Sequence, residues 1–525
     1  MSSLKRDRVV RTLSFLLLLL VVGIIGVTSF AYARETSAFR FFDEENNIVA
    51  GYFLTNGKQL YTDVFMNHNP LTIEISAQLQ RMLSIQTLFE LVKYHRVFMI
   101  ALALCANIFL LIRFRHRAFL FIFVYEFIKF YLSGQMFLAE GMIAYVFAYY
   151  VLLLVSTALA GHKVKLFDLV LSSLGFVFIC LSREPYVPLA LVFFGLILFF
   201  AHSRKIAFAC GVSSMVAIVA YMLQYDLSEF YKQVVLLNRS LANGDLKDQG
   251  GAQMFSGITQ LYQYIVVGLQ LDKPLYMVLG GINIVFGYII YTTVRTMKKY
   301  SAVIFISLIF VLLFLAGIRN YKAGAEWYGM YRSIPYIAIL LAFVSSVASL
   351  RLVGVCMIFT LSIAILHPRS HLREKRVNAD EYYIQYSKTN QSAQVIDLLC
   401  SKYPEPCTIH IDDIDVYPYW ITKKPPSYQY AFYYPVNKAY LDYRQIRERS
   451  LTKSPPVVYF DGSCMVDPAF LPKSIESQYH FLNEFSLDTG KEKQACIAVH
   501  ETLIPYIDED IRSAIAHHQL RFAED

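Results

Sequence analysis

The chain has 525 residues, of which 56% are hydrophobic and 17% are charged, and its formal net charge is +8 at pH 7. Its mean hydropathy is +0.43, which excludes an ordinary soluble protein. The positive charge does not indicate nucleic acid as a partner, because Lys and Arg gather in short loops between apolar runs, where they set membrane topology.

The first apolar run, residues 14–33, follows four basic residues in the amino-terminal segment. It is long enough to span a bilayer, so we expect a retained membrane anchor. Residues 31–33 (Ala-Tyr-Ala) have the form of a signal-peptidase site, and a cleaved signal peptide is the alternative. In both cases the amino terminus is cytoplasmic, and the next loop, residues 34–90, is external.

Three successive carboxylates, Asp43, Glu44 and Glu45, lie just past the point where this run leaves the bilayer, on the side away from the basic amino terminus. Carboxylates held at a membrane surface are costly, so this stretch is the first candidate for chemistry. The alternative, given equal weight, is the capped start of a solvated helix over residues 43–54 that ends near Gly57.

The pattern continues with a Leu-Tyr-x-Asp turn that contains Asp63 and a His-x-Pro that contains His68. It resembles the first external loop of the GT-C superfamily of glycosyltransferases. Members such as protein mannosyltransferases and the lipid A aminoarabinose transferase are membrane enzymes that take a sugar from a polyprenyl-phosphate carrier. The resemblance implies a GT-C-like transmembrane fold and a lipid-linked sugar donor.

Further apolar runs alternate with basic loops, as the positive-inside rule predicts for a multi-pass protein. A long external loop at residues 224–273 separates the seventh run from the eighth. For its end, residues 258–271, the alternatives are a position in the membrane interface and a segment that dips into the membrane. About eleven spans are expected by hydropathy and length. They lie at residues 14–33, 91–112, 118–131, 141–160, 167–181, 187–201, 206–223, 275–291, 302–318, 334–349 and 352–366.

From residue 367 the composition changes and no later run is long enough to span. We therefore expect a transmembrane GT-C-like catalytic domain over residues 1–366 and an extracytoplasmic α/β domain over residues 367–525. Short strand patterns are at residues 407–411, 456–460 and 495–500, and helical patterns are at 392–399 and 443–450. The four cysteines of this domain lie on the oxidising side, where disulfides with three alternative pairings are expected. These are Cys400, Cys407, Cys464 and Cys496.

Three later stretches also resemble the superfamily. Glu140 begins the fourth span, where related enzymes often carry an acidic residue. Residues 327–335 resemble a His-Tyr-x-x-x-x-Pro entry into a late span, although Met330 stands where the histidine is expected. Residues 416–428 resemble a Pro- and Tyr-containing stretch of many bacterial members' terminal domains.

Sugar transfer from a lipid phosphate needs a base for the acceptor hydroxyl and cations that hold the departing phosphate. We assign Asp43 as the base, with Glu44 as the alternate, because adjacent helical residues point about 100° apart. Four basic residues in external loops are candidates for binding the phosphate. These are Arg183, Arg319, Lys322 and Arg332. For each one the alternative is a snorkelling or topology-setting charge.

Glu140, Asp63 and His68 are further substrate-binding candidates, the last two for acceptor or metal. A turn-capping aspartate and a structural histidine are the alternatives. No cofactor is required, and a divalent cation is the one group that remains open. Glu126 and Lys129 lie one turn apart in the third span, where they can neutralise each other.

The predicted function is a hexosyl- or pentosyltransferase that moves a sugar from a polyprenyl-phosphate donor to an extracytoplasmic glycan, lipid or protein, with inversion. The expected location is a bacterial inner membrane, with the carboxyl-terminal domain outside. The alternatives are a transporter or flippase of lipid-linked sugars, which would have repeats and unwound midplane helices, and an O-antigen ligase or polymerase. No nucleotide-binding motif is present, which favours a lipid-linked donor.

Overall fold

The computed structural model describes most of the chain. The described residues are 3–34, 42–239, 256–319, 327–373, 379–411, 415–427, 441–460, 471–485 and 492–522.

The chain divides into two compact units, and each is made of three separate segments. The helical unit comprises Met1–Thr36, Lys93–Met222 and Gln249–Val377. The loop unit comprises Ser37–Val92, Leu223–Asp248 and Asn378–Asp525. The expected division into a membrane domain, 1–366, and a soluble domain, 367–525, stays a prediction. Each unit is described separately below.

Each of the eleven predicted apolar runs coincides with a helix. They are α1 (Ser3–Arg34), α4 (Leu88–Phe114), α5 (Phe119–Ile128), α6 (Ala139–Ala160), α7 (Leu166–Ser182), α8 (Val187–Phe199), α9 (Arg204–Met222), α14 (Pro274–Thr296), α15 (Lys299–Ala316), α16 (Ile334–Val347) and α17 (Leu350–Leu366). In the described chain, six helical stretches are long and apolar enough to cross a membrane, and the 45-residue stretch Leu88–Leu132 contains both α4 and α5. Four further apolar helices are shorter. The count of eleven spans stays a prediction.

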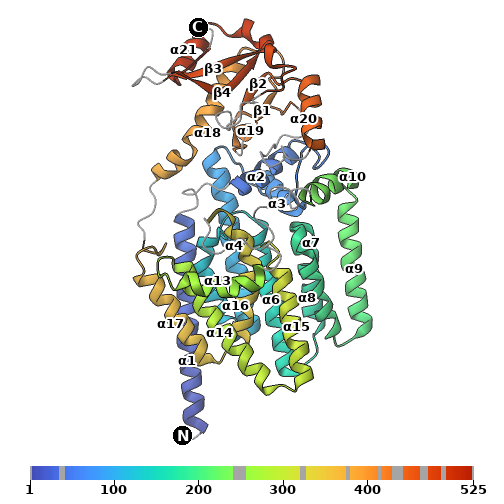
Figure 1. Ribbon diagram of the computed structural model, residues 1–525, viewed down its shortest axis with the longest axis vertical. Coiled ribbons are helices and arrows are strands. Elements are labelled where there is room, and N and C mark those ends of the chain that lie inside the picture. Colours follow the sequence, from blue (N-terminus) through green and yellow to red (C-terminus); the bar gives the residue numbers. More distant parts are fainter. Residues whose placement is uncertain are drawn as a thin grey trace. The chain divides into compact units, whose positions relative to one another are not determined.

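Helices α5, α6 and α16 form the centre of the helical unit. Every residue of α5 is buried, and so are most residues of α6 and α16. Helix α16 packs along α6 (Figure 1). Helix α5 packs against α16 and α1. A helix that is apolar all round is typical of a core position. By contrast, α9 exposes most of its apolar side chains, as a lipid-facing helix does.

A buried ion pair lies within this core. Lys129 Nζ is 2.6 Å from Glu126 Oε2, and both side chains are buried. The other carboxylate oxygen of Glu126 accepts hydrogen bonds from Asn107 Nδ2 at 2.7 Å and from the Tyr145 hydroxyl at 2.8 Å. The prediction that Glu126 and Lys129 neutralise each other is confirmed, and α4, α5 and α6 share the polar contacts.

The predicted interfacial segment near residues 258–271 is helix α13 (Ser256–Gly268). It packs against α14 and α15, and the Asn283 side chain on α14 donates a hydrogen bond to the Leu261 carbonyl at 3.1 Å. The segment is therefore part of the helical unit, whereas residues Leu223–Asp248 belong to the loop unit.

In the loop unit, helix α2 (Phe42–Thr55) carries the three carboxylates in its first turn. It ends as expected just before Gly57, whose φ of +78° suits glycine. Helix α3 (Leu71–Met82) packs on α2. The short helix α10 (Leu227–Phe230) runs into a π-helical turn, η4 (Tyr231–Leu236).

The carboxyl-terminal part of the loop unit contains a five-stranded sheet in the order β1-β2-β4-β3-β5. Strands β1 and β2 are parallel and the other pairs are antiparallel. The strands are β1 (Ile409–Ile411), β2 (Val458–Phe460), β3 (Tyr479–Phe485), β4 (Glu492–His500) and β5 (Leu520–Phe522). The accompanying helices are α18 (Ala379–Cys400), α19 (Tyr417–Thr422), α20 (Leu441–Lys453) and α21 (Glu509–His517). The sequence predicts β1, β2, β4, α18 and α20 but does not indicate β3 or β5.

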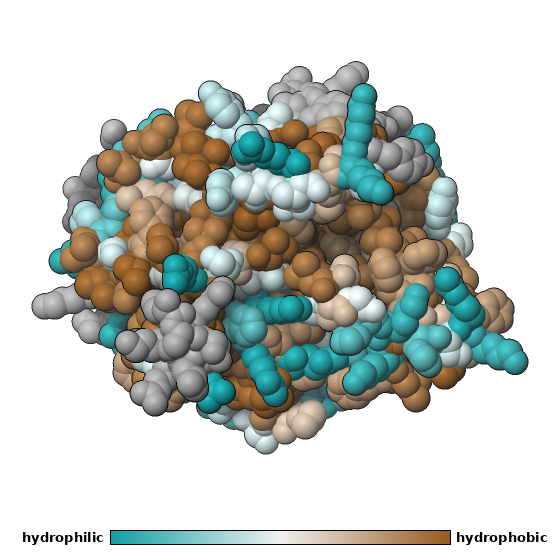
Figure 2. Space-filling view, turned by 90° about the horizontal axis from the view of Figure 1, so that it is seen from below, coloured by the Kyte–Doolittle hydropathy of each residue, from teal (hydrophilic) through white to brown (hydrophobic). Residues whose placement is uncertain are grey.

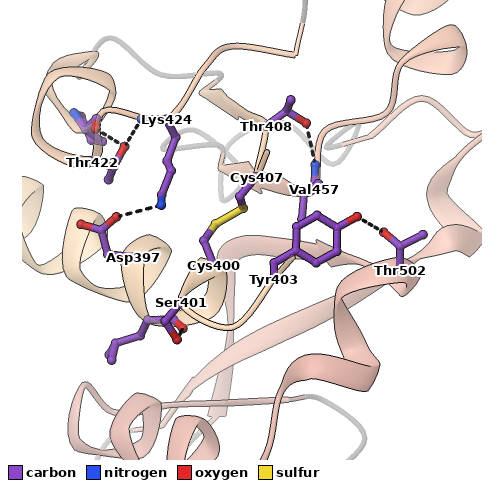
Figure 3. The surroundings of a disulfide bond; sticks show 12 residues. Asp397, Cys400, Ser401, Tyr403, Cys407, Thr408, Thr422, Lys424, Val457 and Thr502 are labelled. Atoms are coloured by element: carbon purple, nitrogen blue, oxygen red, sulfur yellow. Dashed lines mark hydrogen bonds and ion pairs between the residues drawn. A yellow bond between two sulfur atoms is a disulfide. The ribbon is translucent and has the colours of Figure 1, made fainter. Parts of the chain in front are cut away.

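One of the expected disulfides is present, between Cys400 and Cys407 (Figure 3). It ties the last residue of α18 to the segment that enters β1. Lys424 Nζ, 3.8 Å from Asp397, adds an ion pair between α18 and the segment after α19. Cys464 and the side chain of Cys496 lie outside the described residues, so their pairing stays a prediction.

The two ends of α14 test the topology. Lys273 precedes the helix and Lys298 follows it, and the positive-inside rule places Lys298 in the cytoplasm.

Figure 2 views the molecule from the end that carries the amino terminus and shows hydrophilic side chains among broad apolar areas.

In intact cells, a membrane-impermeant maleimide should label Lys273→Cys and leave Lys298→Cys unlabelled, with the unsubstituted chain as the background. Equal labelling of both positions, or labelling of Lys298→Cys alone, would overturn the topology.

Candidate functional site

The acidic start of α2 has one partly exposed and two buried carboxylates. Glu44 and Glu45 are fully buried, whereas Asp43 keeps some exposure. Negative charge in a first helical turn is stabilised by the helix dipole. Of the three, Asp43 is therefore the carboxylate with access to solvent, as a base for an external acceptor requires.

Close packing on α3 fixes the direction of α2. A Cβ added at Gly51 would lie 2.5 Å from Ser76 Oγ, so only glycine allows the two helices to approach this closely. The Gln80 side chain donates to the Ile48 carbonyl at 2.8 Å, and Arg81 donates to the Leu54 carbonyl at 3.2 Å. The helix with the candidate base is thus held along its length.

The turn after α2 contains Asp63 and His68. Asp63 Oδ2 accepts a hydrogen bond from the Gln59 backbone N–H at 2.8 Å, which is the turn-capping alternative. The His68 carbonyl accepts a hydrogen bond from the Tyr61 hydroxyl at 2.7 Å, and its side chain is partly exposed. The structure therefore gives Asp63 a structural contact, and any binding role of these two residues stays a proposal.

Two amide side chains from the long external loop hold this turn, and the sequence does not single them out. Gln233, in the π-helical η4, accepts from the Met66 N–H at 3.0 Å and donates to the Tyr61 carbonyl at 2.7 Å. Asn238 donates to the Asn67 carbonyl at 2.8 Å. A π-helical turn often marks a functional site, and this is the one signal that points to Gln233.

The stretch that resembles a terminal-domain motif, residues 416–428, contacts α2 through what we call the aromatic clasp, formed by Tyr52, Phe53, Tyr419, Trp420 and Lys423. Phe53 and Tyr419 pack edge to face, with ring centroids 5.5 Å apart. The Lys423 ammonium lies 3.4 Å from the Trp420 ring centroid and 4.7 Å from that of Tyr52. Such cation–π contacts are attractive. The clasp joins the carboxyl-terminal sheet domain to the helix that carries Asp43.

In the helical unit, three of the predicted residues lie together in what we call the arginine cluster: Glu140, Arg183 and Arg319. Arg183 Nε donates to Glu140 Oε1 at 2.8 Å, and both side chains are buried. Arg319 Nη1 lies 3.7 Å from the same carboxylate oxygen. This Nη1 is buried and has no hydrogen-bond partner in the described chain.

Helix ends bring these residues together. Glu140 is in the first turn of α6, where a Cβ on the next residue, Gly141, would lie 2.8 Å from the Gly134 carbonyl oxygen. Only glycine fits there, so the start of α6 sits tightly against the preceding turn. Arg183 ends α7, and Arg319 follows α15.

Arg332 adjoins this group through tyrosines. The Tyr186 hydroxyl donates to the Arg332 carbonyl at 2.8 Å, and Arg332 Nε donates to the Tyr331 hydroxyl at 3.3 Å. Glu184, next to Arg183, interacts with it electrostatically. Three guanidinium groups and two carboxylates thus leave a net positive charge. An anion is the ligand that this charge favours.

The predicted site residues therefore fall into two groups. Asp43, Glu44, Asp63 and His68 are in the loop unit, and the arginine cluster with Arg332 is in the helical unit. Lys322 lies outside the described residues. Within those residues, no group of three or more His, Cys, Asp or Glu side chains is placed to hold a metal ion.

No protein-family model matches the sequence, and no curated protein matches it. The structure is similar to a crystal structure of the Archaeoglobus fulgidus oligosaccharyltransferase in complex with zinc and sulfate. The match covers 91% of this chain and 73% of that chain, with 12% sequence identity and a TM-score of 0.39.

Replacing Gln233 with Leu tests how the turn is held. The change removes the hydrogen bonds that Gln233 makes to the Met66 N–H and the Tyr61 carbonyl, and the loss of such a buried hydrogen bond costs about 1–3 kcal/mol. Hydrogen exchange of residues 61–66 should become faster, while Gln86→Leu, at an exposed position in the same unit, should leave it unchanged. Unchanged exchange in Gln233→Leu would show that the amide does not hold the turn.

The aromatic clasp makes a pH prediction. Burial lowers the pKa of Lys423 from 10.5 to about 8. Only the neutral amine reacts with an acylating reagent, so a lower pKa moves the onset of reaction to lower pH. Acylation of Lys423, followed by mass spectrometry, should rise with a midpoint near pH 8, and Tyr52→Ala should shift that midpoint upward. A midpoint near that of an ordinary lysine, about 10.4, in the unsubstituted protein would contradict the burial.

Proposed function

We propose that the protein is a membrane glycosyltransferase that moves a sugar from a polyprenyl-phosphate donor to an extracytoplasmic acceptor, with inversion at the anomeric carbon. The observation that carries the proposal is the arginine cluster. It gathers positive charge at helix ends, next to the loops that the topology places outside the membrane.

Within the cluster, the arginines are not equivalent. Arg183 is committed to Glu140 by a 2.8 Å charge-assisted hydrogen bond, which fixes both buried side chains. Arg319 keeps a buried Nη1 with no hydrogen-bond partner in the described residues, and its side chain is 22% exposed. A buried donor without a partner is costly, and a phosphate oxygen would satisfy it. Arg319 is therefore the proposed phosphate ligand, and Arg183 and Glu140 are positioning residues.

The reaction needs few groups. The acceptor hydroxyl oxygen forms a bond to the anomeric carbon as the bond from that carbon to the phosphate oxygen breaks. The bonding electrons leave with the polyprenyl phosphate, which Arg319 stabilises as charge builds on it. The hydroxyl proton passes to the Asp43 carboxylate, which acts as general base. One displacement of this kind inverts the configuration.

The partly exposed Asp43 tests the base. Asp43→Asn keeps the size of the side chain and removes the basic group, so the variant should fold and bind donor but transfer sugar about 10²–10⁴-fold more slowly. Glu44→Gln, at a fully buried neighbour, should lose less activity. Wild-type turnover in Asp43→Asn together with loss in Glu44→Gln would move the base by one residue. Full activity in both variants would show that neither Asp43 nor Glu44 is the base.

Arginine variants separate binding from structure. Loss of a hydrogen bond to a charged group costs about 1.5–3 kcal/mol, so Arg319→Gln should weaken donor binding roughly 10- to 150-fold without lowering the thermal midpoint. Arg183→Gln removes the closer partner of the buried Glu140 and leaves Arg319 at 3.7 Å, so it should destabilise the fold, by up to about 3–5 kcal/mol. The control is Arg369→Gln, at an exposed residue 3.6 Å from Asp272, which should change neither. Unchanged donor binding in Arg319→Gln would return that residue to a topology-setting role.

A further inference from the structure

A groove of about 520 Å³ lies between α8 and α9 in the helical unit, away from the arginine cluster. Its walls are almost entirely apolar. They are formed by Gly195, Leu198, Phe199, Arg204, Ala207, Phe208, Gly211, Val212, Met215 and Val216.

The lining residues of α9 recur every three or four positions, so they form one face of the helix. The larger side chains of this face are well exposed, with Phe208 at 75% and Val216 at 60%. Glycines keep the groove open. A Cβ added at Gly195 would meet nothing within 4 Å, and one at Gly211 would lie 3.4 Å from Leu198. The groove therefore depends on the absence of side chains at Gly195 and Gly211 and on the exposed face of α9.

The length of the α9 face matches one leaflet of a bilayer. The stretch from Arg204 to Val216 rises about 18 Å at roughly 1.5 Å per residue. Half of a hydrocarbon core that is about 30 Å thick is about 15 Å. The groove therefore extends from the level of the lipid headgroups at Arg204 toward the middle of the membrane.

A cation lies at the mouth of the groove. The Arg204 guanidinium is 5.1 Å from the Phe199 ring centroid, and its side chain is exposed. Among the residues that the structure describes, no carboxylate forms an ion pair with Arg204. Lys205 follows it directly, and the predicted topology puts both at the cytoplasmic surface.

We propose that this groove binds one acyl chain of an anionic phospholipid of the cytoplasmic leaflet, with the lipid phosphate on Arg204. The apolar walls, the leaflet length and the unpaired cation at one end all match a lipid with a negative headgroup. An ordinary boundary lipid covers a helix surface without a hollow or a charge of its own. This site is independent of the proposed sugar transfer.

The test uses the purified full chain in nanodiscs that contain phosphatidylglycerol and phosphatidylcholine, with bound lipid counted by native mass spectrometry. The wild type should retain one phosphatidylglycerol in preference to phosphatidylcholine. Arg204→Gln should lose about five-fold in that preference, since one basic residue at an anionic surface is worth about 1 kcal/mol. Gly195→Leu, which fills the groove from an open position, should lose the retained lipid altogether.

Matched controls come from α14. Arg295→Gln removes an exposed arginine from the last turn of another apolar helix, and Gly287→Leu adds a side chain at another glycine with nothing within 4 Å. Both should keep the lipid, and all four variants should keep the wild-type thermal midpoint, because none of them crowds a packed neighbour.

Four results would overturn the proposal. One is equal retention of the two phospholipids by the wild type. The second is equal loss of lipid in the control variants. The third is displacement of the lipid by a neutral polyprenol, which would make the groove a prenyl-chain site. The fourth is a dimer that Gly195→Leu dissociates, which would make it a contact between two copies.

Discussion

A charge within a membrane is tolerated only where another polar group satisfies it, and the helical unit follows this constraint. Glu126 and Lys129 neutralise each other at the centre of the bundle, where Asn107 and Tyr145 complete the hydrogen bonds of the carboxylate. A second ion pair lies elsewhere in the helical unit, where Arg113 Nη2 is 2.6 Å from Asp168 Oδ2. The Arg113–Asp168 pair joins α4 to α7, so a shifted helix would leave one of these charges alone. Glu126 and Lys129 belong to one helical segment, and the hydrogen bonds from Asn107 and Tyr145 join it to α4 and α6.

Against this background the partly exposed Arg319 differs from the buried cations Lys129 and Arg183. Its neighbour Arg183 already occupies Glu140, so the one carboxylate within reach is shared and Nη1 of Arg319 has no hydrogen bond in the described chain. The loop unit has its own asymmetry, since Asp43 keeps exposure while Glu44 and Glu45 are buried. The function that we propose uses Arg319 as a cation and the partly exposed Asp43 as a base.

The sequence predicts the helices well because length and hydropathy are local properties, and all eleven apolar runs are helical. It also predicts α2 with its end at Gly57. It misses β3 and β5, in which the charged residues Glu484 and Arg521 interrupt the apolar pattern. It also misses Gln233, because the groups that this amide contacts are backbone atoms near Tyr61, far away in sequence. The sequence predicts Arg183 and Glu140 separately as substrate-binding candidates, but only the structure shows that they form an ion pair.

The most direct measurement is the transfer catalysed by the purified chain in nanodiscs, assayed with a panel of polyprenyl-phosphate sugars and the matching nucleotide sugars. The anomeric configuration of each product would be read by NMR. The account predicts release of polyprenyl phosphate, an inverted glycosidic bond and no transfer from nucleotide sugars. Movement of intact donor between leaflets without cleavage, or transfer from a nucleotide sugar, would contradict it.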